Sequence, residues 1–475
     1  MNYNKWGINE EQAKVLKELE KRVNRIIPLV DEIEQENFGI QIDDANIVGI
    51  KLYSCQLKAL PESIGNIKSL LSLGLNLNLL TTLPESVGNL KDLRKFELSN
   101  NQLATLPESF GNLLSLQSLN LRGNQLKTFP EPILKLKSIQ SLELGDNQIT
   151  TLPKSFGELK SLQVLDLGGN QLEKLPESFG ELKSLEKLTL WNNQLGKFPV
   201  PLLKLESLQV LDLGGNQLKV LPDDIGMLKS IQKLSLWKNR LSMLPESFGE
   251  LKSLKDLSIW ENQLTMLPES FGQLQSLEGL YLFENKLTTL PPPILELKSL
   301  HALNLRGNQL TTLPESIGDF ISLEYLNLEL NDLATLPESI SKLKSLKVLY
   351  LSHNENIALP DSIGQLESLQ TLTLRNCKLQ TVPNSLGDLK SLMELYLDGN
   401  QLSTLPDSFS NLSSLITLDL SNNQFTSLQN ICTIWPLTNL RMLILDGNPW
   451  DEEARKWLGR PISELQEHLQ LIYKS

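Results

Sequence analysis

Leucine and other aliphatic residues recur along this chain with a single spacing. From Cys55 to Asn423 the pattern repeats every 23 residues without an insertion, and a longer final step leads to Asn448. Proline shows the same register, because it recurs every 23 residues from Pro61 to Pro406. A fixed period of this length is typical of a solenoid, in which each repeat packs only on its neighbours. The sequence therefore predicts eighteen stacked repeats.

The apolar spacing changes inside each repeat. In residues 162–184, Leu165 and Leu167 are two residues apart, which is the period of a β-strand whose other side chains point outward. From Pro176 onward the spacing becomes three, beginning at Phe179. This second half predicts a helical or 3-10 turn that opens at the proline. Each repeat is therefore expected to form one short strand and one short turn.

A polar marker residue separates the two halves of each repeat. It is asparagine in sixteen repeats and cysteine in two, at Cys55 and Cys377. A buried side chain at this position can bond to the backbone where the strand turns away. We therefore interpret both cysteines as structural residues.

The full pattern is LxxLxLxxNxLxxLPxxφGxLxx, where φ is apolar, as in residues 162–184. It resembles the leucine-rich repeat family. The length of 23 residues and the Leu-Pro pair are similar to the intracellular class shared by Ras-pathway scaffolds, plant Ras-group proteins and many microbial proteins. The resemblance implies an α/β repeat fold, a right-handed solenoid with a horseshoe arc. Parallel strands would line its concave face, and short helical, 3-10 or extended segments its convex face.

Some repeats depart from the pattern. Asn356 replaces a leucine, with Ile357 displaced by one position, and Gln429 replaces a proline. We expect local loosening at both places. Three repeats replace the turn glycine pattern by a second proline, which should favour a more extended turn. These prolines are Pro130 with Pro132, Pro199 with Pro201, and Pro291 to Pro293.

The amino-terminal residues predict a cap, because an open solenoid end would expose a layer of leucines. Asn9 and Gln12 form a candidate capping box. Apolar residues then recur at spacings of three and four over residues 16–33, with Pro28 expected to kink or split the helix. We assign residues 1–46 as an N-terminal helical cap. A coiled-coil dimer through the same seam is the alternative, although we expect a monomer.

The carboxyl-terminal residues predict a second cap. Apolar residues at a helical spacing mark a closing helix, and two tryptophans are expected to cover the last layer. They are Ile462, Leu465, Leu469 and Ile472, with Trp450 and Trp457. We therefore assign residues 47–450 to the eighteen repeats and residues 451–475 to a C-terminal helical cap.

Charge and composition narrow the partner classes. The formal charge of −12 opposes the counterion release that drives nucleic-acid binding, so we expect no nucleic acid. The start of the chain has no apolar signal-peptide core, and no apolar stretch is long enough for a membrane span. Three scattered cysteines fit a reducing compartment. We expect a cytoplasmic protein, with leaderless secretion as an alternative.

Candidate chemistry is sparse. The three histidines, His301, His353 and His468, stand in different parts of the chain without a ligand-spaced partner. No phosphate loop, dinucleotide fingerprint or nucleophile elbow occurs. We expect no catalytic residue, no metal site and no cofactor, and we do not expect an enzyme.

The outward strand positions carry aromatic residues that the repeat itself does not require. We call them the aromatic stripe: Trp191, Trp237, Trp260, Tyr281 and Phe283. Exposed aromatic patches usually mark partner sites, and Trp and Tyr are enriched in interface hot spots. A stabilising ladder of neighbouring rings is the alternative interpretation.

Acidic residues accompany one end of this stripe. Asp166 and Asp212 stand on the strands flanking Trp191, with Glu143 and Asp146 nearby. This region should prefer a basic segment of the partner, with a Lys or Arg resting on the indole. A solvated acidic face without a ligand is the alternative.

A second contact zone is predicted further along the chain. Its outward residues are of hot-spot types: Arg306, Tyr325, Tyr350, Arg375 and Tyr396. The sequence thus favours a protein–protein interaction scaffold in cytoplasmic signalling that binds its partner on the concave face. The alternatives are a regulator of a small GTPase or phosphatase, and a secreted effector that docks on a host protein.

Overall fold

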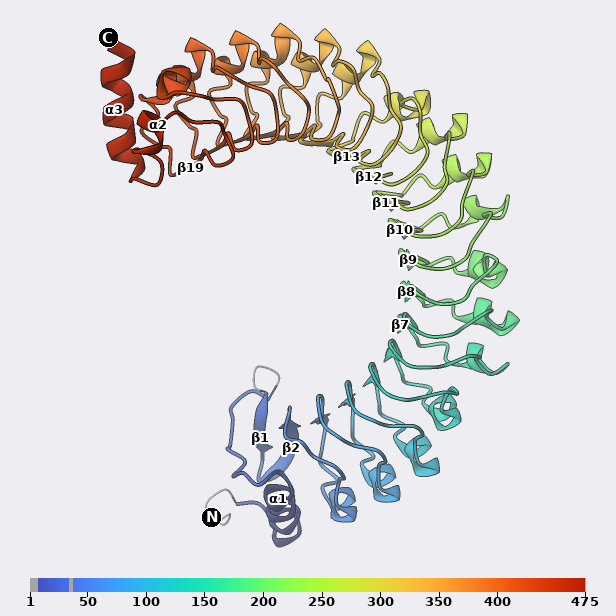
Figure 1. The fold of residues 1–475 in the computed structure, drawn as a ribbon. Coiled ribbons are helices and arrows are strands. Elements are labelled where there is room, and N and C mark those ends of the chain that lie inside the picture. The colour runs from blue at the N-terminus through green and yellow to red at the C-terminus, as the bar shows by residue number, and fades with distance from the viewer. Residues whose placement is uncertain (1–6, 34–36, 475) are drawn as a thin grey trace. The chain divides into compact units, whose positions relative to one another are not determined.

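Each predicted repeat folds as one short strand followed by one 3-10 turn (Figure 1). The computed structural model describes residues 7–33 and 37–474. The chain divides into an amino-terminal unit, Met1–Asn239, and a carboxyl-terminal unit, Arg240–Ser475. Within each unit the strands line the inner side of the curve and the turns the outer side (Figure 1).

The amino-terminal unit begins with helix α1, Glu10–Val23. Its strands are β1 Phe38–Asp43, β2 Asn46–Leu52, β3 Ser72–Gly74, β4 Lys95–Glu97, β5 Ser118–Asn120, β6 Ser141–Glu143, β7 Val164–Asp166, β8 Lys187–Thr189, β9 Val210–Asp212 and β10 Lys233–Ser235. Its 3-10 turns are η2 Glu62–Asn66, η3 Glu85–Asn89, η4 Glu108–Asn112, η5 Glu131–Lys135, η6 Phe156–Glu158, η7 Glu177–Glu181, η8 Val200–Lys204 and η9 Ile225–Met227.

The carboxyl-terminal unit ends with helices α2, Glu452–Arg455, and α3, Ile462–Lys474. Its strands are β11 Asp256–Ser258, β12 Gly279–Tyr281, β13 Ala302–Asn304, β14 Tyr325–Asn327, β15 Val348–Tyr350, β16 Thr371–Thr373, β17 Glu394–Tyr396, β18 Thr417–Asp419 and β19 Met442–Ile444. Its 3-10 turns are η10 Glu246–Glu250, η11 Glu269–Gln273, η12 Pro292–Glu296, η13 Glu315–Asp319, η14 Glu338–Lys342, η15 Asp361–Gln365, η16 Asn384–Asp388, η17 Asp407–Asn411 and η18 Leu428–Ile434.

Strand alternation places leucines inside and variable residues outside, as predicted. β7 pairs with β8 in parallel, with Leu165 opposite Leu188 and Asp166 opposite Thr189. Leu165 and Leu188 are fully buried, whereas Asp166 and Thr189 are half-buried on the face of the strands that points away from the leucine core. Stacking of identical positions therefore makes a continuous leucine core, with each buried side chain contributing about 1.5 to 3 kcal/mol.

The marker asparagines join consecutive repeats, as the sequence predicts. The side-chain amide of Asn170 donates to the carbonyl of Leu144 in the preceding repeat and to that of Leu167 in its own repeat, both at 3.0 Å. Its oxygen accepts from the backbone N–H of Ile149 at 2.9 Å. The buried N–H of Ile149 would otherwise lack a partner, and each carbonyl is shared with a neighbouring marker asparagine, Asn147 or Asn193.

The turn glycines allow close contact between repeats on the outer side. A side chain on Gly157 would collide with the backbone carbonyl oxygen of Ser178 in the next repeat. The same relation holds in the carboxyl-terminal unit between Gly249 and Ser270. Glycine is needed here for space, which explains its place in the repeat pattern.

Two expectations about irregular turns were wrong. The second proline in η5, η8 and η12 does not extend the turn, because all three remain 3-10 helices of five residues. The proline lies at the first or second helical position, where its missing N–H has no partner to lose. Gln429 does not loosen its repeat, because η18 runs for seven residues and Ser427 with Asn430 caps it.

The amino-terminal cap combines a helix with a strand. Asn9 caps α1 by accepting from the N–H of Gln12 at 2.9 Å. The reciprocal bond of a capping box does not form, because the Gln12 side chain accepts from Ile47 N–H instead. α1 ends at Val23 and not at the predicted Pro28 kink, since Asn24 adopts a left-handed conformation. β1 then pairs antiparallel with β2, and β2 pairs in parallel with β3.

The helix α1 buries its apolar seam within its own unit. Val15, Leu16 and Leu19 are fully buried. A coiled-coil dimer through this seam would require those side chains to be exposed, so the structure argues against that alternative.

The carboxyl-terminal cap contains the predicted closing helix. In α3, Leu465 and Leu469 are buried. Trp450 covers the last layer, where it stacks on Phe425 with ring centroids 6.1 Å apart. Trp457 differs from the expectation, because its ring stacks on His468 of α3 at 4.0 Å.

Candidate functional site

The two aromatic-stripe residues of the amino-terminal unit lie half-buried on the outward side of the strands. The Trp191 indole occupies the space that a side chain on Gly168 would need, and Trp237 has the same relation to Gly214. Gly168 and Gly214 are not in the left-handed region, unlike Gly169, so space and not backbone conformation requires them.

Asp166 sits at the centre of a bonded cluster beside Trp191. Its Oδ1 accepts from the backbone N–H of Gly168 at 2.9 Å and from the hydroxyl of Thr189 at 2.5 Å. Its Oδ2 pairs with Arg122 at 3.3 Å. The carboxylate is therefore held by three donors from three different repeats.

Arg122 is a functional candidate that sequence reasoning missed. Its guanidinium bridges Asp166 and Asp146, the second at 2.6 Å, and lies 5.6 Å from the Trp191 ring centroid. The predicted cation on this indole is thus supplied by the chain itself. Arg122 and Asp166 are 44 residues apart, a separation that only the two-repeat stacking brings together.

Two further carboxylates of this unit, Asp212 and Glu143, lie in surroundings that disfavour their ionised form. Asp212 accepts from the N–H of Gly214 at 2.8 Å. Burial raises its pKa, and the nearby charge of Asp166 raises it further, against the lowering effects of that backbone bond and of a hydrogen bond from the Trp237 side chain. Burial likewise raises the pKa of Glu143, again with a contribution from Asp166. Both carboxylates would be stabilised by an added positive charge.

The other three stripe residues belong to the carboxyl-terminal unit and are also half-buried. Trp260 and Phe283 stack with ring centroids 4.8 Å apart and an interplanar angle of 10°. Tyr281 lies against Gly279 on the same strand, with its hydroxyl close to the place of the missing side chain. Strand alternation turns all three rings outward, as predicted.

The predicted second zone forms two clusters and a separate pair. Tyr325 and Tyr350 meet edge to face at 5.6 Å. Arg375 lies 4.2 Å from the Tyr396 ring centroid and pairs with Asp398 at 3.2 Å. Arg306 instead pairs with Glu284 at 2.8 Å.

The tyrosines of this zone share one electrostatic feature. Burial is the largest cause of a raised pKa at Tyr325, Tyr350 and Tyr396. The carboxylates of Glu329 and Glu394 raise the pKa of Tyr350 further. The three phenols are therefore held as neutral hydrogen-bonding groups.

Comparisons with known proteins agree with this geometry. A family model of the leucine-rich repeat region matches residues 133–217, 201–289 and 338–474. The solved structure of a leucine-rich repeat protein from Leptospira interrogans is 36% identical, with a TM-score of 0.71, and the match covers 82% of this chain and 93% of that chain. The chain belongs to the leucine-rich repeat family. No curated protein matches it.

Two plant receptors are also similar to this leucine-rich repeat protein. The peptide hormone receptor RGFR1, solved in complex with RGF2, is 27% identical, with a TM-score of 0.64 and coverage of 87% of this chain and 76% of that chain. The Arabidopsis receptor kinase HAESA, solved with the peptide hormone IDA and the co-receptor SERK1, is 26% identical. Its TM-score is 0.59, and the match covers 93% of this chain and 84% of that chain.

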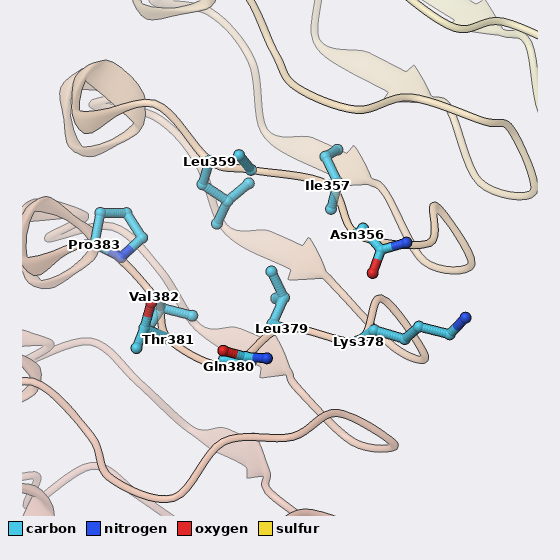
Figure 2. A pocket seen from close by; sticks show the side chains of 10 residues that line it. Asn356, Ile357, Leu359, Lys378, Leu379, Gln380, Thr381, Val382 and Pro383 are labelled. Carbon is cyan, nitrogen blue, oxygen red and sulfur yellow. The ribbon is translucent and has the colours of Figure 1, made fainter.

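One depression of the leucine-rich repeat surface lies where the repeat pattern breaks (Figure 2). Asn356 takes a left-handed conformation, and Ile357 becomes buried in the place of the missing leucine. Leu359 is partly released from the core, and a depression of about 400 Å³ opens towards residues 378–383. The expected loosening at Asn356 stays a prediction. The depression contains no predicted site residue, and depressions of similar size also lie between regular repeats, for example beside Leu175.

The remaining candidates for chemistry are dispersed. Within residues 7–33 and 37–474, no group of three or more His, Cys, Asp or Glu side chains is arranged to hold a metal ion. Cys377 is buried, and burial raises its pKa to about 11. Across the same residues, no helix combines the length and apolar character needed to cross a bilayer.

Proposed function

We propose that this protein is a protein-interaction module that binds a partner protein on its strand face through the aromatic stripe. The stacked pair of Trp260 and Phe283 carries the proposal. Other repeats place small polar residues at the same register, for example Ser99 and Ser352, so the fold does not require rings there. Aromatic side chains add contact area with little loss of conformational entropy, which suits them to binding.

The similar solved structures support a peptide or protein as the partner. RGFR1 and HAESA have the same fold, and both were solved in complex with peptide hormones. Binding of this kind needs a shaped and partly apolar surface but no catalytic group. We therefore propose recognition without catalysis and without a cofactor.

Replacement of the stacked pair tests the proposal. A photoreactive residue in place of Ser258, next to the stripe on β11, would first capture the partner for mass spectrometry. We then expect Trp260→Ala with Phe283→Ala to weaken partner binding by at least about tenfold, as for hot-spot residues. The matched control is Met243→Ala with Met266→Ala, because these methionines are 60% and 64% exposed and lie outside the strands.

The same variants separate binding from a stabilising ladder. Ring pairs in neighbouring strands contribute about 0.2 to 1 kcal/mol each, so a ladder role would lower the melting temperature. Unchanged affinity for the captured partner, together with a lower melting temperature, would refute the proposed binding role. Lost affinity at an unchanged melting temperature would support it.

A further inference from the structure

One cluster in the amino-terminal unit shows how this surface holds a guanidinium group. Arg122 lies between the carboxylates of Asp146 and Asp166 and faces the ring of Trp191. Asp166 is oriented by the N–H of Gly168, and Trp191 rests on that same glycine. We call this arrangement the Arg122 cluster.

A shift of two repeats, or 46 residues, reproduces much of this cluster within the same unit. The acid, the glycine and the ring recur as Asp212, Gly214 and Trp237. Gly214 again donates its N–H to the acid, at 2.8 Å, and Trp237 again rests on the glycine. Both places therefore share the bond from glycine to acid and the ring over the glycine, while Asp212 also accepts from the Trp237 side chain.

The basic residue does not recur. The position equivalent to Arg122 is Gly168, which has no side chain, and Asn192 stands in the place of Asp146. Among the described residues, no basic side chain contributes to the pKa shift of Asp212. After the same shift of 46 residues, Trp191 stands where the Arg122 cluster has Gly145. The register therefore puts a second indole beside Asp212.

We propose that Asp212, Trp237 and Trp191 form a receptor site for an arginine side chain presented by the partner protein. We call it the Asp212 site. The inference rests on the proposed function and names what the partner contributes to it. Arginine fits better than lysine, because its planar guanidinium can stack on an indole while bonding to a carboxylate. Burial also raises the pKa of Asp212. A guanidinium bound beside it would lower that pKa again, because an opposite charge stabilises the ionised carboxylate.

Titration with N-acetyl-arginine amide tests the site directly. The full chain would carry 5-fluorotryptophan, and Trp237→Phe would assign one fluorine resonance among the seven tryptophans. We expect the Trp237 resonance to shift on titration, and Asp212→Asn to weaken binding about fivefold or more. N-acetyl-lysine amide should bind more weakly. An unmoved resonance, an unchanged affinity in Asp212→Asn, or equal affinity for lysine would overturn the assignment.

A gain of affinity provides a second test. Asn192→Asp would restore the carboxylate that Asp146 supplies in the Arg122 cluster, and both positions have nearly the same backbone φ, 48° and 51°. We expect this variant to bind N-acetyl-arginine amide about fivefold more tightly. No gain, in a variant that melts like the parent, would count against the equivalence of the two sites.

Removal of Arg122 tests whether the Arg122 cluster can itself bind an added guanidinium group. Arg122→Ala empties the cluster, and Arg122→Gln is the second variant in case the first folds poorly. In either variant the Trp191 resonance should respond to N-acetyl-arginine amide, and in the parent protein it should respond less. No response of Trp191 in a folded variant would overturn the template.

These titrations need no natural partner. The arginine site can therefore fail while the Trp260 and Phe283 experiment still supports partner binding. Conversely, a response at Trp237 would stand even if the stripe proved to be a stabilising ladder.

Discussion

The indole of Trp191 fills the space that a side chain on Gly168, in the preceding repeat, would need. The ring is thereby fixed on the strand surface, with one side on backbone and the Arg122 guanidinium nearby. A tryptophan held in this way loses little further entropy when a partner binds. The glycine in one repeat and the tryptophan in the next thus act as a pair.

The first prediction concerns this pair. Gly168→Ala should displace the Trp191 ring and lower the free energy of unfolding by about 1 to 3 kcal/mol, as for an overpacked site. Urea unfolding followed by tryptophan fluorescence would measure the change. The control is Gly196→Ala, because a Cβ atom on Gly196 would meet nothing within 4 Å. Equal stability of the two variants would contradict the pairing.

The second prediction concerns the marker asparagines. Asn170→Ala leaves the N–H of Ile149 without a partner, whereas the carbonyls of Leu144 and Leu167 still accept from Asn147 and Asn193. Since a buried unsatisfied group costs about 1 to 3 kcal/mol, we expect a loss of about 1 to 3 kcal/mol in calorimetry. Gln171→Ala changes an exposed neighbour and should be close to neutral. A loss no larger than that of the control would refute the structural role.

The third prediction is a pH dependence set by Asp212. Burial raises the pKa of Asp212 in the folded state, so the ionised group opposes folding at neutral pH. We therefore expect Asp212→Asn to be more stable than the parent at pH 7. The difference should shrink as the pH falls through the raised pKa towards the usual carboxyl range near about 4. Urea midpoints of both proteins from pH 7 down to acidic pH would show it.

Glu18 provides the control of opposite sign. Hydrogen bonds from Ser63 and Arg22 lower the pKa of Glu18, so its ionised form favours folding above the ordinary pKa. Glu18→Gln should therefore be less stable than the parent at pH 7, and this difference should vanish as acid protonates the carboxylate. If both variants moved in the same direction, the assigned causes would be wrong.

The fourth prediction ranks the cysteines. Burial raises the pKa of all three thiols, and that of Cys377 to about 11, but only Cys377 and Cys432 are buried from solvent. Cys55 is only half-buried, so iodoacetamide should modify it first at pH 8, as mass spectrometry would show. In guanidinium chloride all three should react alike. Early modification of Cys377 in the folded protein would contradict its structural role.

The repeat architecture was predictable because each repeat contacts mainly its neighbours. The alternation of Leu165 and Leu167 with outward residues, and the bonds of Asn170, follow from spacing and from the need to satisfy buried backbone groups. The end of α1 was not predictable in the same way. Its apolar spacing continued to Ile33, but the left-handed conformation of Asn24 ended the helix earlier.

The candidate site was predictable only in part. Strand alternation predicted that Trp260 and Phe283 point outward, but it did not predict that their rings stack. Arg122 was missed because a long side chain reaches across two repeats, and strand spacing alone gives no direction for it. A search for basic and acidic outward residues two repeats apart would have found the pair of Arg122 and Asp166.

The marker asparagines all bond backwards to the preceding repeat, and this direction matters during synthesis. The N–H of Ile149 donates to the side chain of Asn170, and that of Phe425 donates to the side chain of Asn448, which follows it by 23 residues. A repeat emerging from the ribosome therefore keeps an unmet donor until its successor has been translated. During translation the most recently completed repeat is therefore always the one whose backbone N–H lacks its partner, until the carboxyl-terminal cap forms.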